Sequence, residues 1–243
     1  MMNIVIIGAT SAIAQAVAQR LAPQAQFFLV ARSEKRLQAV ATDLSVRGAR
    51  AVTTHVVDLL DFAQHDATLD RAFQTLGKVD LILLSHGTLG DQQACEMSFA
   101  ETERELRTNF LSVVSLLTTL ANRLITQRHG TIAVVGSVAG DRGRTAYVYC
   151  AAKGATAIFC QGLRRRLFRH GVHLLTIKPG FVRTPMTAHF SQGRLFVSPQ
   201  RVARDIVCAI HRKKNLLYTP WYWRWIMLAV KSLPEGLFKR MTF

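Results

Sequence analysis

Tyr149 and Lys153 are the residues whose types and spacing most directly suggest chemistry. They stand four residues apart at the start of a helix-favouring run, so their side chains share one helix face. A free tyrosine has a pKa of about 10, and a neighbouring ammonium group lowers that pKa by stabilising the phenolate. Ser137 follows the apolar run Thr131–Val135 and adds a hydroxyl that can hold a carbonyl or alcohol oxygen beside the phenol. Together these residues outline a site for reducing carbonyl groups.

The same pair of residues also fits an ordinary surface helix with a solvated lysine. Tyr147 shows the ambiguity, because it lies two residues away and has Ala151, not a lysine, four residues further on. The interpretation therefore depends on what the rest of the chain supplies.

Length and composition indicate a folded protein with a large apolar core. The chain has 243 residues, of which 49% are hydrophobic, and its mean hydropathy is +0.16, which argues against disorder. The strand-like run Asn3–Ile7 begins close to the first methionine and nothing resembles a secretory signal, so we expect a cytoplasmic protein. The four cysteines show neither paired nor metal-ligand spacing, which predicts reduced thiols and no metal site: Cys95, Cys150, Cys160 and Cys208.

The formal charge of +16 is concentrated in the second part of the chain. Residues 1–140 contain 12 basic and 12 acidic residues, whereas residues 141–243 contain 19 basic and 3 acidic residues. Nucleic acid, an anionic membrane surface or a phosphorylated substrate would each suit such a region. No helix-turn-helix, RNA-binding or zinc-finger pattern is present, so we expect no nucleic-acid partner.

Strand-like apolar runs alternate with helix-favouring runs along most of the sequence. The expected strands include Asn3–Ile7, Gln26–Ala31, Ala51–Val57, Val79–Leu84, Thr131–Val135 and Val172–Ile177. The expected helices include Glu34–Val46, Asp61–Leu76, Phe99–Gln127 and Tyr147–His170. This alternation predicts a Rossmann-type, doubly wound parallel sheet of about seven strands flanked by helices. In that architecture ligands bind beyond the carboxyl ends of the strands, which is where the polar motifs of this sequence fall.

The ends of the first two strands carry features of a dinucleotide site. Gly8 permits a tight turn, after which the amide groups at the start of a helix can face a pyrophosphate. No acidic residue ends the second strand, where one would bind the ribose 2′-hydroxyl. Arg32 stands there instead and can meet a 2′-phosphate, although an ordinary surface arginine is the alternative.

Six elements, in order along residues 3–218, resemble the short-chain dehydrogenase/reductase (SDR) family. They are Gly8-Ala-Thr-Ser-Ala-Ile-Ala14, Asp58, Asn109, Ser137, Tyr149-x-x-x-Lys153 and Pro179-Gly-Phe-Val-Arg-Thr184. The resemblance implies that Tyr149 donates and accepts the proton, that Lys153 binds the nicotinamide ribose, that Ser137 orients the substrate, and that Asn109 anchors a proton-relay water.

The resemblance also implies a set of residues that hold NAD(P), with Asp58 at the adenine and Val182 and Thr184 on the nicotinamide side. Arg32 resembles the basic residue of members that prefer NADP over NAD. The whole set comprises Gly8, Thr10, Ser11, Ala12, Ile13, Arg32, Asp58, Leu59, His86, Gly87, Tyr149, Lys153, Pro179, Gly180, Val182 and Thr184.

Three features depart from the family pattern: the first turn, the segment after the fourth strand, and one spacing. Ala12 and Ala14 replace glycines of the first turn, and the methyl group of Ala12 is expected to crowd the pyrophosphate or to shift the turn. His86 stands in the segment after the fourth strand, where the family usually has Asn-Asn-Ala-Gly. The spacing from Ser137 to Tyr149 is one residue shorter than is common in the family.

The C-terminal segment, residues 219–243, is expected to be an amphipathic extension of the catalytic domain, residues 1–218. All three tryptophans lie here beside arginine and lysine. The apolar run is shorter than the roughly 20 residues of a membrane-spanning helix, so one interpretation is a helix lying on the inner face of an anionic membrane. The alternative is that it packs on the substrate mouth or on a second subunit.

The sequence therefore predicts an NAD(P)-dependent enzyme that interconverts a carbonyl and an alcohol, assembled as a homodimer or homotetramer. The whole sequence is similar to bacterial family members near the reductase subunit of decaprenylphosphoryl-ribose epimerase, which would imply a lipid-linked or sugar substrate. A cofactor-binding sensor or scaffold with weak or no turnover is the alternative, supported by Ala12 and His86.

Overall fold

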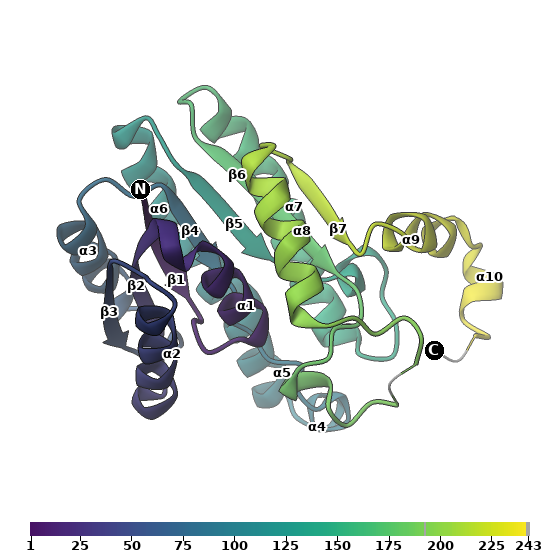
Figure 1. The fold of residues 1–243 in the computed structure, drawn as a ribbon. Coiled ribbons are helices and arrows are strands. Elements are labelled where there is room, and N and C mark those ends of the chain that lie inside the picture. The colour runs from purple at the N-terminus through teal and green to yellow at the C-terminus, as the bar shows by residue number, and fades with distance from the viewer. Residues whose placement is uncertain (192, 242–243) are drawn as a thin grey trace.

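The central sheet has seven parallel strands in the order β3-β2-β1-β4-β5-β6-β7. The computed structural model describes residues 1–191 and 193–241 (Figure 1). The strands are β1 (Met2–Ile7), β2 (Ala25–Ala31), β3 (Ala51–Val56), β4 (Leu81–Leu84), β5 (Thr131–Val135), β6 (His173–Pro179) and β7 (Leu216–Thr219). The chain crosses over between β3 and β4, so the carboxyl ends of β1 and β4 flank the switch point at which such sheets bind ligands. The predicted fold class is confirmed.

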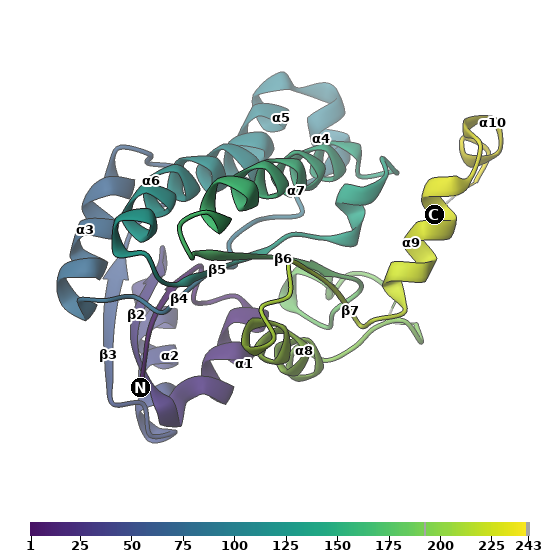
Figure 2. The same cartoon turned by 90° about the horizontal axis from the view of Figure 1, so that it is seen from above.

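Helices cover both faces of the sheet, as the view from above shows (Figure 2). One face is covered by α1 (Ala12–Leu21), α2 (Glu34–Val46) and α8 (Pro199–His211). The other is covered by α3 (Gln64–Leu76), α6 (Ser112–Gln127) and α7 (Tyr147–Phe168). Each helix buries an apolar stripe, for example Leu69, Ala72 and Leu76 of α3. The inner strands β1, β2, β4, β5 and β6 are largely buried on both faces, which explains their continuous apolar runs, whereas the edge strand β3 has no buried residue.

The region expected as one helix, Phe99–Gln127, contains a π-helical turn. It comprises α5 (Phe99–Leu106), a π segment at Arg107–Leu111, and α6. Asn109 lies inside the π segment and is fully buried. Such a turn is rare and is often found at functional sites, and nothing in the apolar periodicity of the sequence marks it. A short helix that the sequence did not predict, α4 (Gln92–Met97), precedes α5 and is capped by the Asp91 side chain.

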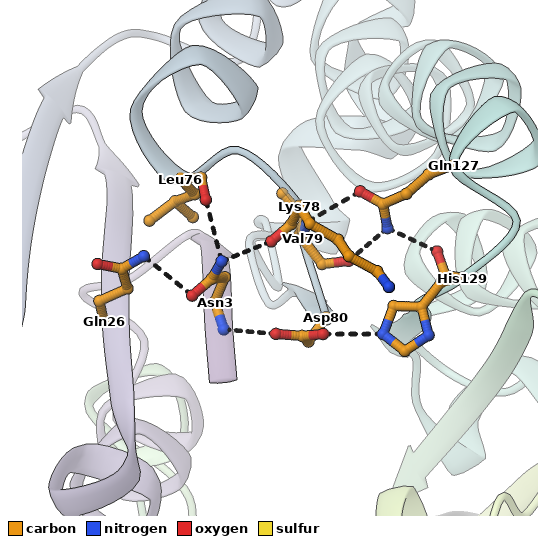
Figure 3. A network of polar contacts seen from close by, with 8 residues as sticks. All are labelled: Asn3, Gln26, Leu76, Lys78, Val79, Asp80, Gln127 and His129. Atoms are coloured by element: carbon orange, nitrogen blue, oxygen red, sulfur yellow. Dashed lines mark hydrogen bonds and ion pairs between the residues drawn. The ribbon is translucent and has the colours of Figure 1, made fainter. Parts of the chain in front are cut away.

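A polar network holds the amino edge of the sheet, opposite the switch point (Figure 3). Asn3 lies at its centre: its backbone N–H donates to Asp80 at 2.8 Å, and its side-chain amide donates to the carbonyls of Leu76 and Lys78 at 2.9 and 2.6 Å. His129 pairs with the other oxygen of Asp80 at 2.8 Å. The network connects β1 to the loops before β4 and β5. It therefore fixes the amino ends of the central strands and involves none of the residues at the carboxyl edge.

The C-terminal segment forms two helices, α9 (Trp223–Ser232) and α10 (Glu235–Phe238). Trp223 and Met227 of α9 are buried, at 2% and 1% exposure, against Val138 and neighbouring side chains. The last strand, β7, ends at Thr219, whose carbonyl accepts a hydrogen bond from the Gly180 N–H. None of the helices among the described residues has the length and apolarity needed to cross a bilayer.

Candidate active site

The turn between β1 and α1 leaves the first amide groups of α1 without a side-chain cap. Ser11 stands at the N-cap position, yet its hydroxyl accepts a hydrogen bond from Ser85 Oγ at 3.0 Å instead of capping the helix. Gly8 has a φ of +82°, and a Cβ atom there would lie 2.5 Å from the backbone nitrogen of His86. Only glycine fits this position. The uncapped amides of α1 can therefore accept an anion.

Ala12 is compatible with the turn. It is the first residue of α1, and the only described non-glycine residues with positive φ are Arg128 and Lys213. The turn therefore needs no glycine at residue 12 for backbone reasons. Ile13 and Ala14 are buried under the turn, while the Thr10 carbonyl accepts hydrogen bonds from Gln15 and Arg36.

Arg32 follows β2 directly and is exposed at the carboxyl edge. Among the described residues it makes no hydrogen bond or ion pair, so its guanidinium group is available to an anion. Arg36, one helical turn further on, donates to the Thr10 carbonyl at 3.2 Å and thereby ties α2 to the turn that follows β1.

Asp58 and Leu59 follow β3 on the same edge. Asp58 is exposed, and its carboxylate accepts a hydrogen bond from the Leu60 N–H at 3.0 Å. The Leu59 carbonyl accepts from His65 Nε2 at 3.1 Å, and His65 Nδ1 lies 2.9 Å from Ser115 Oγ. His65 therefore fixes this segment against α6, and burial lowers its pKa. The sequence did not identify His65.

His86 and Gly87 continue from β4 into the centre of the site. The Ser112 hydroxyl donates to the Thr108 carbonyl at 2.7 Å and therefore accepts from His86 Nε2 at 2.8 Å. His86 Nδ1 is buried and has no partner in the described part of the chain. Burial, with the nearby Lys153 charge, lowers the pKa of His86 to about 3, so the ring is neutral.

Asn109 holds the segment after β4 through its side chain. Its Oδ1 accepts from the Thr88 N–H at 3.2 Å, and its Nδ2 donates to Glu105 Oε2 at 3.0 Å. Its backbone carbonyl accepts from the Thr156 hydroxyl at 3.1 Å, which links the π segment to α7. Glu105 and Thr88 were not identified from the sequence, since a glutamate in a helix normally predicts a solvated face.

Ser137, Tyr149 and Lys153 lie together at the carboxyl end of β5 and the start of α7. Lys153 is 4% exposed, and its Nζ lies 5.6 Å from the centre of the Tyr149 ring. Burial raises the pKa of Tyr149 to about 12, although a hydrogen bond with Ser137 lowers it. Burial also lowers the pKa of Lys153 to about 8, against the opposite effect of Glu105. The lowered tyrosine pKa expected from the Tyr-x-x-x-Lys spacing is thus not found, because the loss of solvent raises the pKa by more than the hydrogen bond with Ser137 lowers it.

The loop after β6 brings the last predicted residues to the same edge. Pro179 ends β6, Gly180 follows, and the Thr184 N–H donates to Thr187 Oγ1 at 3.2 Å. Val182 is buried and bridges to Val197. Phe181 packs edge-on against Trp223, with ring centres 5.2 Å apart.

Asp141 and Arg142, four and five residues after Ser137, join the segment after β5 to strands β6 and β7 and to the C-terminal segment, respectively. The side chain of Asp141 is almost fully buried, forms an ion pair with Lys178, and accepts from the Tyr218 hydroxyl at 2.7 Å. Arg142 donates to the carbonyls of Val230 and Leu233 at 2.6 and 2.7 Å and pairs with Glu235 at 2.9 Å. The sequence analysis counted Asp141 and Arg142 only in the charge of residues 141–243 and did not identify these contacts.

Most of the predicted site residues thus lie at or just after the carboxyl ends of six neighbouring strands, β3, β2, β1, β4, β5 and β6. Asn109 joins them from the π segment. Tyr147, the alternative tyrosine, is 50% exposed. No group of three or more His, Cys, Asp or Glu side chains is arranged to hold a metal ion within the described ranges.

Comparison with known proteins agrees with this architecture. Residues 2–195 match a family model described as short chain dehydrogenase. An uncharacterized oxidoreductase of Mycobacterium tuberculosis (strain CDC 1551 / Oshkosh) is 37% identical over 239 residues, covering 98% of this chain and 96% of the relative. One from Streptomyces coelicolor is 35% identical over 243 residues, covering 99% and 96%.

Two solved structures share the fold at low identity. A variant of actinorhodin polyketide ketoreductase with NADPH has a TM-score of 0.81 at 21% identity, covering 91% of this chain and 97% of that one. Levodione reductase has a TM-score of 0.81 at 22% identity, covering 90% and 95%. At these identities the likeness concerns the fold alone.

Proposed function

Because the chain belongs to the short-chain dehydrogenase/reductase family, we propose that it is an NADP-dependent carbonyl reductase with Tyr149 as its proton donor. As a family member it is an oxidoreductase that interconverts carbonyl and alcohol groups with NAD(P). The observation that carries the finer proposal is the cluster of Ser137, Tyr149 and Lys153 at the carboxyl edge of the sheet.

The proton chemistry follows from the pKa values at this cluster. With a pKa of about 12, Tyr149 is protonated at neutral pH and can give its proton to the oxygen of a carbonyl as that group is reduced. The Ser137 hydroxyl orients the same oxygen, and the Lys153 ammonium stabilises the phenolate that is left behind. In the reverse direction the phenolate takes the proton of the alcohol. A bound nicotinamide would supply or accept the hydride.

The chain offers groups that fit a dinucleotide along the same edge. The uncapped amides at the start of α1 suit the pyrophosphate, and Asp58 and Leu59 suit the adenine. The backbone and side chains of Val182 and Thr184 suit the nicotinamide side, while Lys153 suits the ribose. These assignments carry the family's roles onto this chain.

Assay of the purified protein with NADPH and an activated diketone, such as 9,10-phenanthrenequinone, tests the proposal. Consumption of NADPH that depends on the diketone supports a reductase. NADPH binding without any turnover across a panel of ketones and alcohols would favour a sensor or scaffold instead.

For the cofactor, we expect Arg32→Ala to weaken NADPH binding and to leave NADH binding nearly unchanged. Arg32 is exposed beside the turn and is free of other described partners, so it suits a 2′-phosphate. Loss of a hydrogen bond to a charged group corresponds to about 1.5–3 kcal/mol, roughly 10- to 150-fold in the dissociation constant. Fluorescence titration with both cofactors measures the effect.

Arg20→Ala is the matched control, because Arg20 is also exposed but lies at the opposite end of α1. It removes the same charge and should leave both titrations unchanged. Equal NADPH affinities of wild type and Arg32→Ala would remove the NADP preference.

The C-terminal segment favours a lipid-linked, anionic substrate presented at a membrane surface. While Trp223 faces the protein, Trp221 and Trp225 are 65% and 59% exposed, and Leu228 and Leu237 are exposed beside them. Basic side chains accompany this face: Arg224, Lys231, Lys239 and Arg240. Exposed tryptophan next to arginine and lysine suits the headgroup level of an anionic bilayer.

We expect the protein to sediment with phosphatidylglycerol vesicles, less so in high salt, and not with phosphatidylcholine vesicles. Serine substitution of both Trp221 and Trp225 should weaken this binding by at least about tenfold, because two exposed aromatic anchors are lost while Trp223 stays in place. Phe168→Ser, on the exposed end of α7, is the control and should bind as wild type. Equal binding of the double variant would remove the membrane role from the proposal.

For assembly, we propose a homodimer or homotetramer that uses α7 and the helices beside it. Four arginines on or directly after α7 would repel their copies across a two-fold axis if they faced the partner, so the assembly requires them to point away from it: Arg164, Arg165, Arg166 and Arg169. Arg164 donates to the carbonyls of Leu174 and Asn215, at 2.9 Å each, and Arg166 donates to Asn122 at 2.6 Å. Arg165 and Arg169 are exposed. Ile158 is exposed on the same helix, which favours a partner there. A monomeric mass by light scattering at micromolar protein and physiological salt would contradict this assembly.

A further inference from the structure

Glu105 is a buried carboxylate that the proposed chemistry leaves unexplained. It lies in the last turn of α5 and is 6% exposed. It accepts from the Thr88 hydroxyl at 2.9 Å and from Asn109 Nδ2 at 3.0 Å. No ion pair formed among residues 1–191 and 193–241 includes it. A carboxylate without water needs a compensating charge or several hydrogen bonds.

The loop after β4 encloses this carboxylate closely. A Cβ atom on Gly90 would lie 2.5 Å from Glu105 Cδ and 2.8 Å from its Oε2. Gly90 also has a φ of +69°, a conformation that other residues rarely adopt. The backbone of the loop therefore rests directly on the carboxylate, which fixes it toward the site rather than toward solvent.

A short path of contacts joins Glu105 to Lys153. Asn109 binds Glu105 through Nδ2 and presents Oδ1 to Gly87. A Cβ atom on Gly87 would lie 2.6 Å from Asn109 Oδ1 and 3.1 Å from Lys153 Nζ. The side-chain amide of Asn109 and the ammonium group of Lys153 therefore both lie next to Gly87. Burial lowers the pKa of Lys153, and the charge of Glu105 acts in the opposite direction and raises it.

We infer that Glu105 is the buried counter-charge of Lys153, a positioning residue that keeps the ammonium ion charged beside Tyr149. The other titratable groups on the surrounding elements do not fill this role. His86, in the loop after β4, is neutral because burial lowers its pKa to about 3, and Tyr149 is neutral because burial raises its pKa to about 12. Two buried thiols lie on the helices that pack against α5, namely Cys95 of α4 and Cys150 of α7.

The direct test is the titration of Lys153 in Glu105→Gln, which keeps the size of the side chain and removes its charge. The protein is labelled with carbon-13 lysine, and the resonance of Lys153 is assigned by its absence in Lys153→Met. We expect the pKa of Lys153 to fall from about 8 by at least about one pH unit, the low end of the effect of a nearby opposite charge.

Glu103→Gln is the matched control. Glu103 lies on the same helix with its side chain 53% exposed, so its loss removes the same charge from the protein and should leave Lys153 unchanged. An unchanged titration in a folded Glu105→Gln variant would overturn the inference. Should that variant not fold, Glu105→Met is measured instead: it also removes the charge, so the pKa of Lys153 should again fall by at least about one pH unit. An unchanged titration in that variant would equally overturn the inference.

The effect on turnover rests on the proposed function, whereas the titration needs neither cofactor nor substrate. Reduction requires the ammonium form of Lys153, which is present below its pKa and lost as the pH rises through it. We therefore expect the alkaline limb of the pH–rate profile with NADPH and 9,10-phenanthrenequinone to move to lower pH in Glu105→Gln. A shifted Lys153 titration without any turnover in the wild type would keep the inference and remove the reductase proposal.

Discussion

Replacing Tyr149 with phenylalanine is expected to lower turnover by at least about 100-fold, the low end for general acid catalysis. The substitution removes the phenolic proton and keeps the ring, so the packing of α7 and the environment of Lys153 are retained. Cofactor affinity should therefore change little. Steady-state rates with NADPH and a diketone, together with NADPH titration, measure the two effects separately.

Tyr147→Phe is the matched control, since it makes the same change two residues away on a half-exposed side chain. It should be nearly silent. If Tyr147→Phe proves the more damaging of the two, the assignment of the active tyrosine is wrong.

Replacing Trp223 with alanine is expected to lower the free energy of unfolding by about 3–5 kcal/mol, the usual range for a buried tryptophan. Trp223 fills the space above Gly180, where a Cβ atom would lie 1.8 Å from its ring, and it packs edge-on against Phe181. Removing the ring leaves a cavity between α9 and the loop after β6. Urea denaturation followed by circular dichroism measures the loss.

Trp225→Ala serves as the comparison, because Trp225 lies two residues further along the same helix and faces solvent. It should change the free energy of unfolding by less than about 0.5 kcal/mol. Equal losses in both variants would show that α9 is not docked on the loop through Trp223.

Six of the seven strands, and most of the helices between them, could be predicted because their residues repeat at the spacing that burial requires, whereas β7 and α8 were not predicted. Glu34–Val46 was predicted with the observed bounds, since its apolar positions face the sheet at helical intervals. The π segment around Asn109 could not be predicted, because one additional residue in a turn changes the hydrogen bonds without changing the local composition. The helix α4 was missed because it is short and has little apolar periodicity.

The part of the candidate site that could be predicted consists of residues at helical spacing or at the ends of strands. Tyr149 and Lys153 are one turn apart, so a single helix brings them together. Ser137 falls at a strand end that the sheet places beside them. Glu105 is different, because its importance comes from contacts with Thr88 and Gly90 that the fold brings together. The loss of solvent around Tyr149, which reverses the expected change of its pKa, likewise depends on the packed structure.

The placement of Trp223 has a practical consequence for spectroscopy. The three tryptophans of the chain all lie within residues 221–225, so the intrinsic tryptophan emission of the whole protein comes from one short stretch at the start of α9. Trp223 is buried, whereas Trp221 and Trp225 face water. Release of α9 from the loop would expose Trp223 and move the emission to longer wavelength, while immersion of Trp221 and Trp225 in lipid would move it to shorter wavelength. Tryptophan fluorescence of the unlabelled protein can therefore distinguish these two events, because they shift the emission wavelength in opposite directions.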